Sequence, residues 1–276
     1  MDADRIAEND SQKGLVVQIQ GSSFVDGPGI RTTIFLKGCP LRCQWCCNPE
    51  TQEFHPEENQ LYPEKGTSKI FGKWLTVDEV MQVIVKDIRF YRSSGGGVTI
   101  AGGEPTFQPD FTLKLIQRCH ELDIPVALDT CGYTVNQKAV MALESADVLL
   151  FDLKNMNPAE HARNTGVSND RILANLKRLV ELKKYIVIRV PLIPGYTDTQ
   201  PNIVAIGDFL ADLGAGSLKE VNLLAYHLGG LTKYEMLGRP YPLDKNLQPQ
   251  SEEQLQKIKQ TLVSILGEGC PVYFGG

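Results

Sequence analysis

Short apolar runs rich in β-branched residues alternate along this chain with longer stretches in which apolar residues recur every three or four positions. The short runs predict buried strands, and the longer stretches predict amphipathic helices. The expected strands cover residues 15–20, 32–38, 97–102, 125–130, 147–154, 185–194 and 220–227. The expected helices cover residues 76–92, 110–121, 136–144, 170–183, 201–213 and 251–266.

The helix expected over 76–92 has the clearest pattern. Thr76 is a natural N-cap, and Glu79 completes a capping box three residues later. Its apolar residues share one face, as expected of a helix that packs on a sheet. They are Val77, Val80, Met81, Ile84, Val85 and Ile88.

Near-continuous apolar strands that alternate with helices predict a parallel sheet covered on its faces. Six strand–helix units indicate a full or partial α/β barrel. Because no linker, repeat or low-complexity tract interrupts this order, we expect one domain over residues 1–276. The polar residues 1–13 are expected to form a flexible N-terminus.

Polar and ionisable residues gather where the expected strands end. In barrels of this kind the active site lies at the carboxyl ends of the strands. The cysteine-rich stretch follows the strand at 32–38, and Gly102, Gly103 and Glu104 follow the next strand. The remaining strands contribute Asp129, the stretch 152–154, Arg189 and His227. We therefore expect one functional rim built from six strands.

Composition and charge exclude some function classes. The net charge is −5 with a pI near 5.5, and no block of like charge stands out, which argues against a nucleic-acid partner. No apolar run approaches the roughly 18 residues of a membrane span. The acidic start lacks a signal peptide. We therefore expect a cytoplasmic protein, in which clustered cysteines bind metal rather than form disulfides.

Four of the seven cysteines, Cys39, Cys43, Cys46 and Cys47, lie within nine residues. A structural zinc site takes four ligands, commonly as two separated pairs, and no second pair is present. Adjacent side chains point apart, so Cys46 and Cys47 would rarely bind one cluster together. An iron–sulfur cluster normally takes four thiolates, so three would leave one iron open. A zinc knuckle or coincidental buried cysteines remain the alternatives.

The spacing Cys39-x3-Cys43-x2-Cys46, followed by Gly-Gly-Glu-Pro at 102–105, resembles the radical S-adenosylmethionine (SAM) family. The resemblance implies a partial (β/α)6 TIM-like barrel and one [4Fe–4S] cluster whose open iron is chelated by SAM. It also implies reductive cleavage of SAM to a 5′-deoxyadenosyl radical. Gly102 and Gly103 suit such a site, because a residue without a Cβ lets the backbone approach a ligand closely.

Further motifs narrow the resemblance to one group within that family. They are VDGPGIRT at 25–32, WCCNPE, LDTCG, FDLK, HARNTGVSN, IPGYTD and YHLGGLTKYEMLG. In this order the motifs resemble the glycyl-radical-enzyme activating enzymes, of which the pyruvate formate-lyase activator is one. That family implies abstraction of a hydrogen from a glycine in the C-terminal loop of a partner glycyl radical enzyme. Pyruvate formate-lyase or a related enzyme is the expected partner, and reduced flavodoxin or ferredoxin is the expected electron donor. We expect a monomer.

The same resemblance implies roles for individual residues, and no catalytic residue beyond the cluster and the SAM site. The cluster ligands are Cys39, Cys43 and Cys46. The SAM-binding residues are Trp45, Cys46, Cys47, Gly102, Gly103, Glu104, Asp129, Asp152, Leu153, Lys154, Arg189 and His227. Asp129 and Asp152 would also hold a monovalent cation, Na⁺ or K⁺. The residues that grip the partner's glycine loop are Asp26, Gly27, Pro28, Gly29 and Arg31.

Simpler interpretations stay open for some of these residues. Asp152 and Lys154 could form a surface ion pair worth roughly 0–1 kcal/mol. His227 could be a hydrogen-bonded core histidine, and DGPG could be an ordinary turn. At the level of function, the alternatives are a radical SAM enzyme acting on a small molecule and a non-catalytic iron–sulfur electron-transfer module.

The chain also departs from its relatives in ways that bear on the partner. Residues 48–96 contain no cysteine, whereas many relatives carry an inserted ferredoxin-like segment there, so we expect one cluster only. Ala101 stands where the family usually has Ser, and Cys47 stands where His or Ser is usual. These departures leave the identity of the partner open.

Overall fold

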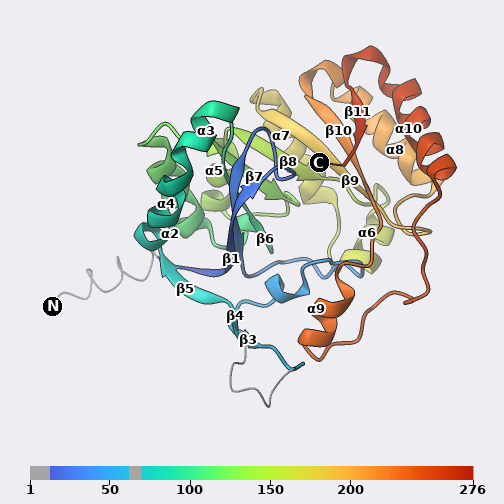
Figure 1. Cartoon of the computed structure of the whole chain (residues 1–276). Helices are drawn as coiled ribbons and strands as arrows, with labels where there is room; N and C mark the ends of the chain where they lie inside the picture. The colour runs from blue at the N-terminus through green and yellow to red at the C-terminus, as the bar shows by residue number, and fades with distance from the viewer. Residues whose placement is uncertain (1–12, 62–69, 276) are drawn as a thin grey trace.

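The computed structural model describes residues 13–61 and 70–275. The expected flexible N-terminus therefore lies outside the described residues, except for Lys13, which begins the first strand. The main sheet has the order β11-β10-β9-β8-β7-β6-β2-β1-β5 (Figure 1). Its strands are β1 (Lys13–Ser23), β2 (Arg31–Leu36), β5 (Lys73–Thr76), β6 (Gly97–Gly102), β7 (Val126–Thr130), β8 (Val148–Asp152), β9 (Tyr185–Leu192), β10 (Glu220–Ala225) and β11 (Val272–Phe274).

Six consecutive strands, β2 and β6 to β10, are parallel neighbours. This confirms the expected partial barrel. The run at 15–20 is part of β1, which pairs antiparallel with β2 and so flanks the parallel strands. Four strands were not predicted from the apolar pattern: β5, β11 and the small pair β3 (Glu57–Glu58) and β4 (Ile70–Phe71). The sheet ends at β5 and β11 and does not close.

The helix expected over 76–92 begins as predicted but does not run through. Thr76 and Glu79 form the capping box at the start of α2 (Val77–Ile84). A 3₁₀ turn at Val85–Asp87 then separates α2 from α3 (Ile88–Ser94). The Tyr91 hydroxyl lies 3.1 Å from the Ile84 carbonyl oxygen, and Asp87 accepts a hydrogen bond from Thr32. The Tyr91 hydroxyl also lies 2.6 Å from the Thr32 hydroxyl, so Thr32 of β2 contacts both the 3₁₀ turn and α3. These contacts compete with a regular helix, and the continuous-helix prediction was wrong.

The other expected helices are confirmed to within a few residues. They are α4 (Pro109–His120), α5 (Gln137–Ser145), α7 (Asp170–Glu181), α8 (Gln200–Asp212) and α10 (Glu252–Leu266). Two short helices were missed, α6 (Pro158–Thr165) and α9 (Leu231–Met236), because each is too short for a periodic apolar pattern. Among the described residues, no helix is long and apolar enough to cross a membrane.

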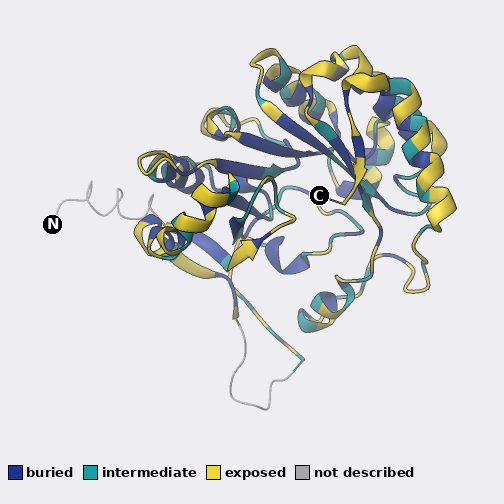
Figure 2. Cartoon of the chain, turned by 45° about the horizontal axis from the view of Figure 1, so that its top comes forward, coloured by how far each residue is buried: buried dark blue, intermediate teal, exposed yellow. Residues whose placement is uncertain are grey.

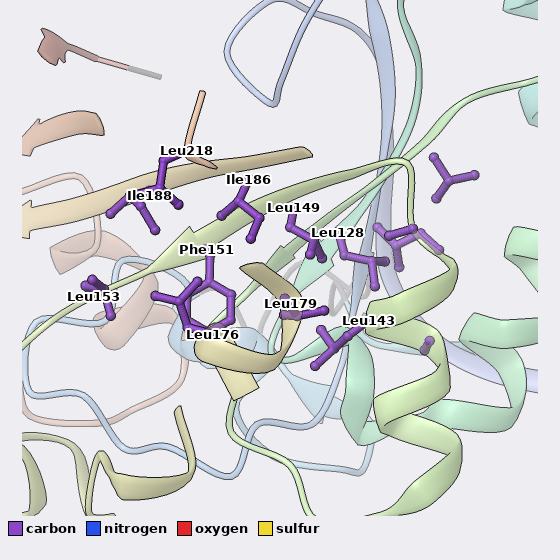
Figure 3. Packing of buried hydrophobic residues seen from close by; sticks show 14 of the residues in the cluster. Leu128, Leu143, Leu149, Phe151, Leu153, Leu176, Leu179, Ile186, Ile188 and Leu218 are labelled. Carbon is purple, nitrogen blue, oxygen red and sulfur yellow. The ribbon is translucent and has the colours of Figure 1, made fainter. Parts of the chain in front are cut away.

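The main hydrophobic core lies between the sheet and its covering helices. Figure 3 shows Phe151 of β8 and Leu128 of β7 packed near Leu176 and Leu179 of α7 and Leu143 of α5. Figure 2 shows buried strands and helices whose outer faces are exposed. A second, smaller cluster lies on the opposite face of the strands, inside the barrel: Ala127, Val148, Leu150 and Val187. The interior of the barrel therefore has few apolar residues, which leaves room for a site.

Candidate active site at the carboxyl ends of the strands

A cavity of about 470 Å³ opens at the carboxyl ends of the parallel strands. We call it the upper cavity. The cysteine loop that follows β2 lines it together with groups from β6, β7, β8 and β9. It therefore brings together residues that lie far apart in the sequence, from Val17 to Lys233. The expected site residues that line it are Asp26, Cys39, Cys43, Trp45, Cys46, Cys47, Gly102, Gly103, Asp129, Asp152, Lys154 and Arg189.

Backbone hydrogen bonds hold the cysteine loop in place. Gly38 N–H donates to the Thr51 carbonyl at 2.7 Å, and Cys39 N–H donates to that of Gln52 at 3.0 Å. Cys46 N–H closes the loop on the Cys43 carbonyl at 3.1 Å. Since many of its polar backbone groups are bonded within the protein, the loop can present its side chains to the cavity.

The three cysteines of the motif fit an iron–sulfur cluster. Cys39, Cys43 and Cys46 are free thiols on one loop and face one cavity. Burial raises the pKa of Cys39 to about 12 and also raises the pKa of Cys43 and Cys46, so thiolates here need a positive partner. Among the described residues, no group of three His, Cys, Asp or Glu is arranged to hold a single metal ion. A cluster binds each thiolate on a different iron, so it tolerates thiols that stand farther apart.

The cysteine loop itself requires the two glycines at the end of β6. Gly102 has φ of +110°, and a Cβ there would lie 2.4 Å from the backbone of Leu36. A Cβ on Gly103 would lie 2.2 Å from the Gly38 carbonyl oxygen. Gly103 N–H also donates to the Leu36 carbonyl at 3.0 Å. The two glycines thus let the end of β6 pass directly against the start of the cysteine loop.

Asp152 and Lys154 form an ion pair inside the cavity, not on the surface. Lys154 Nζ lies 2.7 Å from Asp152 Oδ2, and the two side chains are 7% and 26% exposed. β8 ends at Asp152, so Lys154 lies just beyond the strand and not within it as expected. Burial by itself lowers the pKa of Lys154, but the Asp152 carboxylate and the Cys43 thiol outweigh this and raise it.

Asp129 and Arg189 form a second pair, with Arg189 Nη1 3.0 Å from Asp129 Oδ2. Burial raises the pKa of Asp129 to about 6, although Arg189 opposes the shift, and Asp152 adds to it. Asp129 raises the pKa of Arg189. The Nε atom of Arg189 is buried and has no hydrogen-bond partner among the described residues. The cavity therefore contains a crowded set of charges with one donor unsatisfied.

Three of the expected SAM-binding residues do not line the cavity. The Glu104 carboxylate is buried and accepts hydrogen bonds from Thr106, the Thr130 hydroxyl and the Cys131 N–H, so it ties the ends of β6 and β7 together. Leu153 belongs to the main core. His227 is exposed, and its Nδ1 accepts from Gly229 N–H, so the core-histidine interpretation of it was wrong.

The DGPG segment forms a firmly held turn between β1 and β2. The Asp26 carboxylate accepts hydrogen bonds from the hydroxyls of Ser23 at 2.6 Å and Thr33 at 2.7 Å. Arg31 is 1% exposed, and its guanidinium donates to Thr99 and to the Pro28 and Val98 carbonyls. Arg31 therefore supports the turn from within, and Asp26 is the residue of the segment that reaches the upper cavity.

A half-buried contact between the cysteine loop and α9 was not predicted from the sequence. Lys233 Nζ lies 2.6 Å from Glu50 Oε1 and 2.5 Å from Asn48 Oδ1, and all three residues line the cavity. Gly230 packs on the backbone of Cys46 and Cys47. Both segments lie in motifs that marked the family, WCCNPE and LTKYEMLG, but nothing in their spacing predicted that they meet.

Comparison with known proteins agrees with this geometry. Residues 33–205 match the Radical SAM superfamily. The chain is 36% identical to the (2S)-3-sulfopropanediol dehydratase activating enzyme of Klebsiella oxytoca, over 94% of this chain and 96% of that protein. It is also 36% identical to the trans-4-hydroxy-L-proline dehydratase activating enzyme of Clostridioides difficile, over 89% of this chain and 95% of that protein.

Solved structures show the same fold. A domain of pyruvate-formate lyase-activating enzyme from Bacteroides vulgatus matches with a TM-score of 0.53 and 31% identity, covering 66% of this chain and 99% of that one. Streptococcus suis SuiB bound to its precursor peptide SuiA matches with a TM-score of 0.61 at 16% identity, covering 86% of this chain and 46% of that one, a likeness of fold alone.

A partial α/β barrel whose rim carries a three-cysteine loop defines a radical SAM enzyme, and this family uses a [4Fe–4S] cluster and SAM. The chain belongs to the radical SAM superfamily and, within it, to the glycyl-radical-enzyme activating enzymes.

Proposed function

We propose that this chain removes one hydrogen atom from a glycine in the C-terminal loop of a partner glycyl radical enzyme and so activates it. The observation that supports this most is that Asp26 of the DGPG turn lines the same cavity as Cys39, Cys43 and Cys46. A reduced [4Fe–4S] cluster with SAM, when bound, supplies the one-electron chemistry that takes a hydrogen atom from carbon. The protein supplies the position of the glycine.

In this proposal the thiolates of Cys39, Cys43 and Cys46 hold the cluster, and Cys47 stands beside it without binding iron. The Lys154 ammonium faces the carboxylate of SAM, and Asp129 and Asp152 hold a monovalent cation beside it. The remaining groups assigned to SAM are the backbone of Trp45, Cys46 and Cys47, the glycines Gly102 and Gly103, and Arg189. Glu104 supports these groups from outside the cavity through its hydrogen bonds with Thr130 and the Cys131 N–H. Leu153 and His227, which the resemblance also assigned to SAM, lie outside the cavity.

The partner is pyruvate formate-lyase or a related glycyl radical enzyme. Relatives at 36% identity are named for unlike partners, a sulfopropanediol dehydratase and an indoleacetate decarboxylase among them, so the class of partner is better supported than any member. We also propose one cluster, because residues 48–96 contain no cysteine. Reduced flavodoxin or ferredoxin is the proposed electron donor, and the enzyme is proposed to act as a monomer within one domain.

Anaerobic reconstitution tests the cluster and its ligands. We expect about four irons per chain and a visible spectrum that changes when SAM is added. Cys46→Ser should lose the cluster, and the neighbouring Cys47→Ser should keep iron near the level of the unmodified protein. A cluster that ignores SAM would favour an electron-transfer module, and loss of iron in Cys47→Ser would overturn the ligand assignment.

Electron paramagnetic resonance tests the partner. The reduced, reconstituted protein is mixed with SAM and with candidate glycyl radical enzymes, and a glycyl doublet is expected with the correct one. The matched control is the same partner with its target glycine changed to alanine, which should give no doublet. SAM cleavage without a doublet from any candidate would instead favour action on a small molecule.

A further inference from the structure

A second cavity of about 300 Å³ lies inside the barrel, nearer the amino ends of the strands. We call it the lower cavity. Along β9, Val187 lines the lower cavity, Pro191 lines the upper one, and Arg189 lines both. These side chains all face the barrel interior, because residues two apart on a strand point the same way. The two cavities are therefore stacked along the barrel and share Arg189.

The DGPG turn borders both cavities. Gly27 and Pro28 line the lower cavity, and Val25 and Asp26 line the upper one. Phe24, which also lines the lower cavity, is 72% exposed, and Val25 is 60% exposed. Exposed apolar side chains of this kind are typical of contact surfaces. A polypeptide that crosses this turn with a glycine in the upper cavity would pass the mouth of the lower one.

Glu220 gives the lower cavity its chemical character. It begins β10 and lines the cavity with Asn222, whose amide donates to Glu220 Oε1 at 3.1 Å. Among the described residues, the Glu220 carboxylate forms no ion pair. The cavity walls include the ring of Tyr185 and the aliphatic side chains of Leu150 and Val187. An unpaired carboxylate in a cavity that also has aromatic and aliphatic wall atoms suits a long side chain with a cationic end.

The wider charge balance favours the same ligand. Apart from the Glu50–Lys233 pair, the carboxylates that line the two cavities outnumber the cations. The carboxylates are Asp26, Asp129, Asp152 and Glu220, and the cations are Lys154 and Arg189. Arg189 is already paired with Asp129. Its unsatisfied Nε–H would donate a hydrogen bond to a carbonyl oxygen, which any polypeptide backbone offers.

We propose that the lower cavity is a specificity pocket for a lysine or arginine side chain of the partner's glycine loop, with Glu220 as its counter-ion. This inference rests on the proposed function. It gives the enzyme a way to select its partner by a residue near the glycine, at a distance from the atoms that react. In this arrangement the DGPG turn also separates the partner's target glycine, in the upper cavity, from the basic side chain in the lower cavity.

Glycine-centred peptides of alanine and serine test the pocket, with one lysine moved along the sequence one position at a time. The target glycine carries deuterium. The reconstituted enzyme, reduced by an added one-electron reductant, is assayed with SAM for deuterium in 5′-deoxyadenosine, and peptide binding is measured by fluorescence anisotropy. One lysine position should bind about tenfold more tightly than the lysine-free peptide, as a desolvated charge pair allows. Glu220→Gln should abolish that difference and leave binding of the lysine-free peptide unchanged.

Three controls separate the outcomes. Glu181→Gln removes an exposed carboxylate on α7 and should keep the lysine preference. Glu220→Lys should reverse the charge preference. This variant should bind most tightly a peptide that carries glutamate at the position where the unmodified enzyme prefers lysine. SAM cleavage without peptide should be equal in all variants. Deuterium transfer with no preference for any lysine position would overturn the pocket alone, and failure of every peptide to transfer deuterium would count against the proposed function itself.

Discussion

The two faces of β8 and of the residues just after it differ in residue type and in role. One face packs against the helices and is entirely apolar: Leu149, Phe151 and Leu153. The other face looks into the barrel and changes from apolar to charged along the strand: Leu150, Asp152 and Lys154. Because neighbouring residues belong to opposite faces, one short segment can stabilise the fold and furnish the site independently.

The two faces of the whole sheet differ in the same way. Because the apolar core lies on the helix-facing side, the charged residues of the site do not have to be buried within it. The helix-facing side supplies most of the buried apolar residues. The barrel side keeps only a small apolar cluster and gathers ion pairs above it. Stability and chemistry are therefore separable, and substitutions on the two faces should fail in different ways.

The largest effect on stability is expected from the helix-facing side. Phe151 is fully buried, and its ring packs against Gly132. Phe151→Ala should lower the free energy of unfolding by about 3–5 kcal/mol, as measured by urea denaturation. The protein that remains folded should still bind iron after reconstitution. If the folded fraction lost its cluster, the two faces would not be independent.

Gly103→Ala should damage the site more than the fold. The added methyl group would meet two carbonyl oxygens, at 2.2 Å on Gly38 and 2.6 Å on Thr51. Because these are backbone atoms, the cysteine loop must shift, at a cost of about 1–3 kcal/mol. We expect reduced iron content and a weaker spectral response to SAM. Gly216→Ala, where the added methyl has open space, is the matched control and should behave like the unmodified protein.

A pH dependence is expected from Asp129 on the barrel face. Burial raises the pKa of Asp129 to about 6 in the folded protein, so the folded state holds its proton more tightly than the unfolded state does. Its contribution to stability is complete below about pH 4 and is lost as the pH rises through about 6. Asp129→Asn should remove this contribution. The free energy of unfolding, measured between about pH 4 and pH 7, should therefore change with pH at different slopes in the unmodified protein and in Asp129→Asn. Equal pH dependence in the two proteins would contradict the raised pKa of Asp129.

The smallest effect is expected far from both faces, at the start of α10. Ser251 and Gln254 form a capping box there. Ser251→Ala should lower the free energy of unfolding by about 1 kcal/mol, with no change in iron content or in the response to SAM. Ser251→Asp should restore most of the loss, because Asp also caps helices well. A change in the cluster would show that α10 is coupled to the site.

Local patterns in the sequence were sufficient for most of the fold. The apolar runs located the six parallel strands, and the capping box at Thr76 marked the start of α2. They failed where distant residues override local preference, as at Asp87 and Tyr91, whose bonds to Thr32 interrupt the expected helix. They also failed for the two-residue strands β3 and β4, which are too short to carry a period.

The sequence by itself determined which chemistry this protein can support, because the spacing of Cys39, Cys43 and Cys46 is a local property of one loop. Only the tertiary structure decided which polar residues are free to take part in it. Glu104 and Arg31 come from motifs as specific as that of Asp152, yet both are buried and saturated by hydrogen bonds. No sequence motif marked Glu220 as a functional residue. Its position became apparent only from the pairing of β9 with β10, which places it beneath Arg189. Hydrogen-bond saturation and burial depend on contacts between distant segments, so no pattern along the chain could have revealed them.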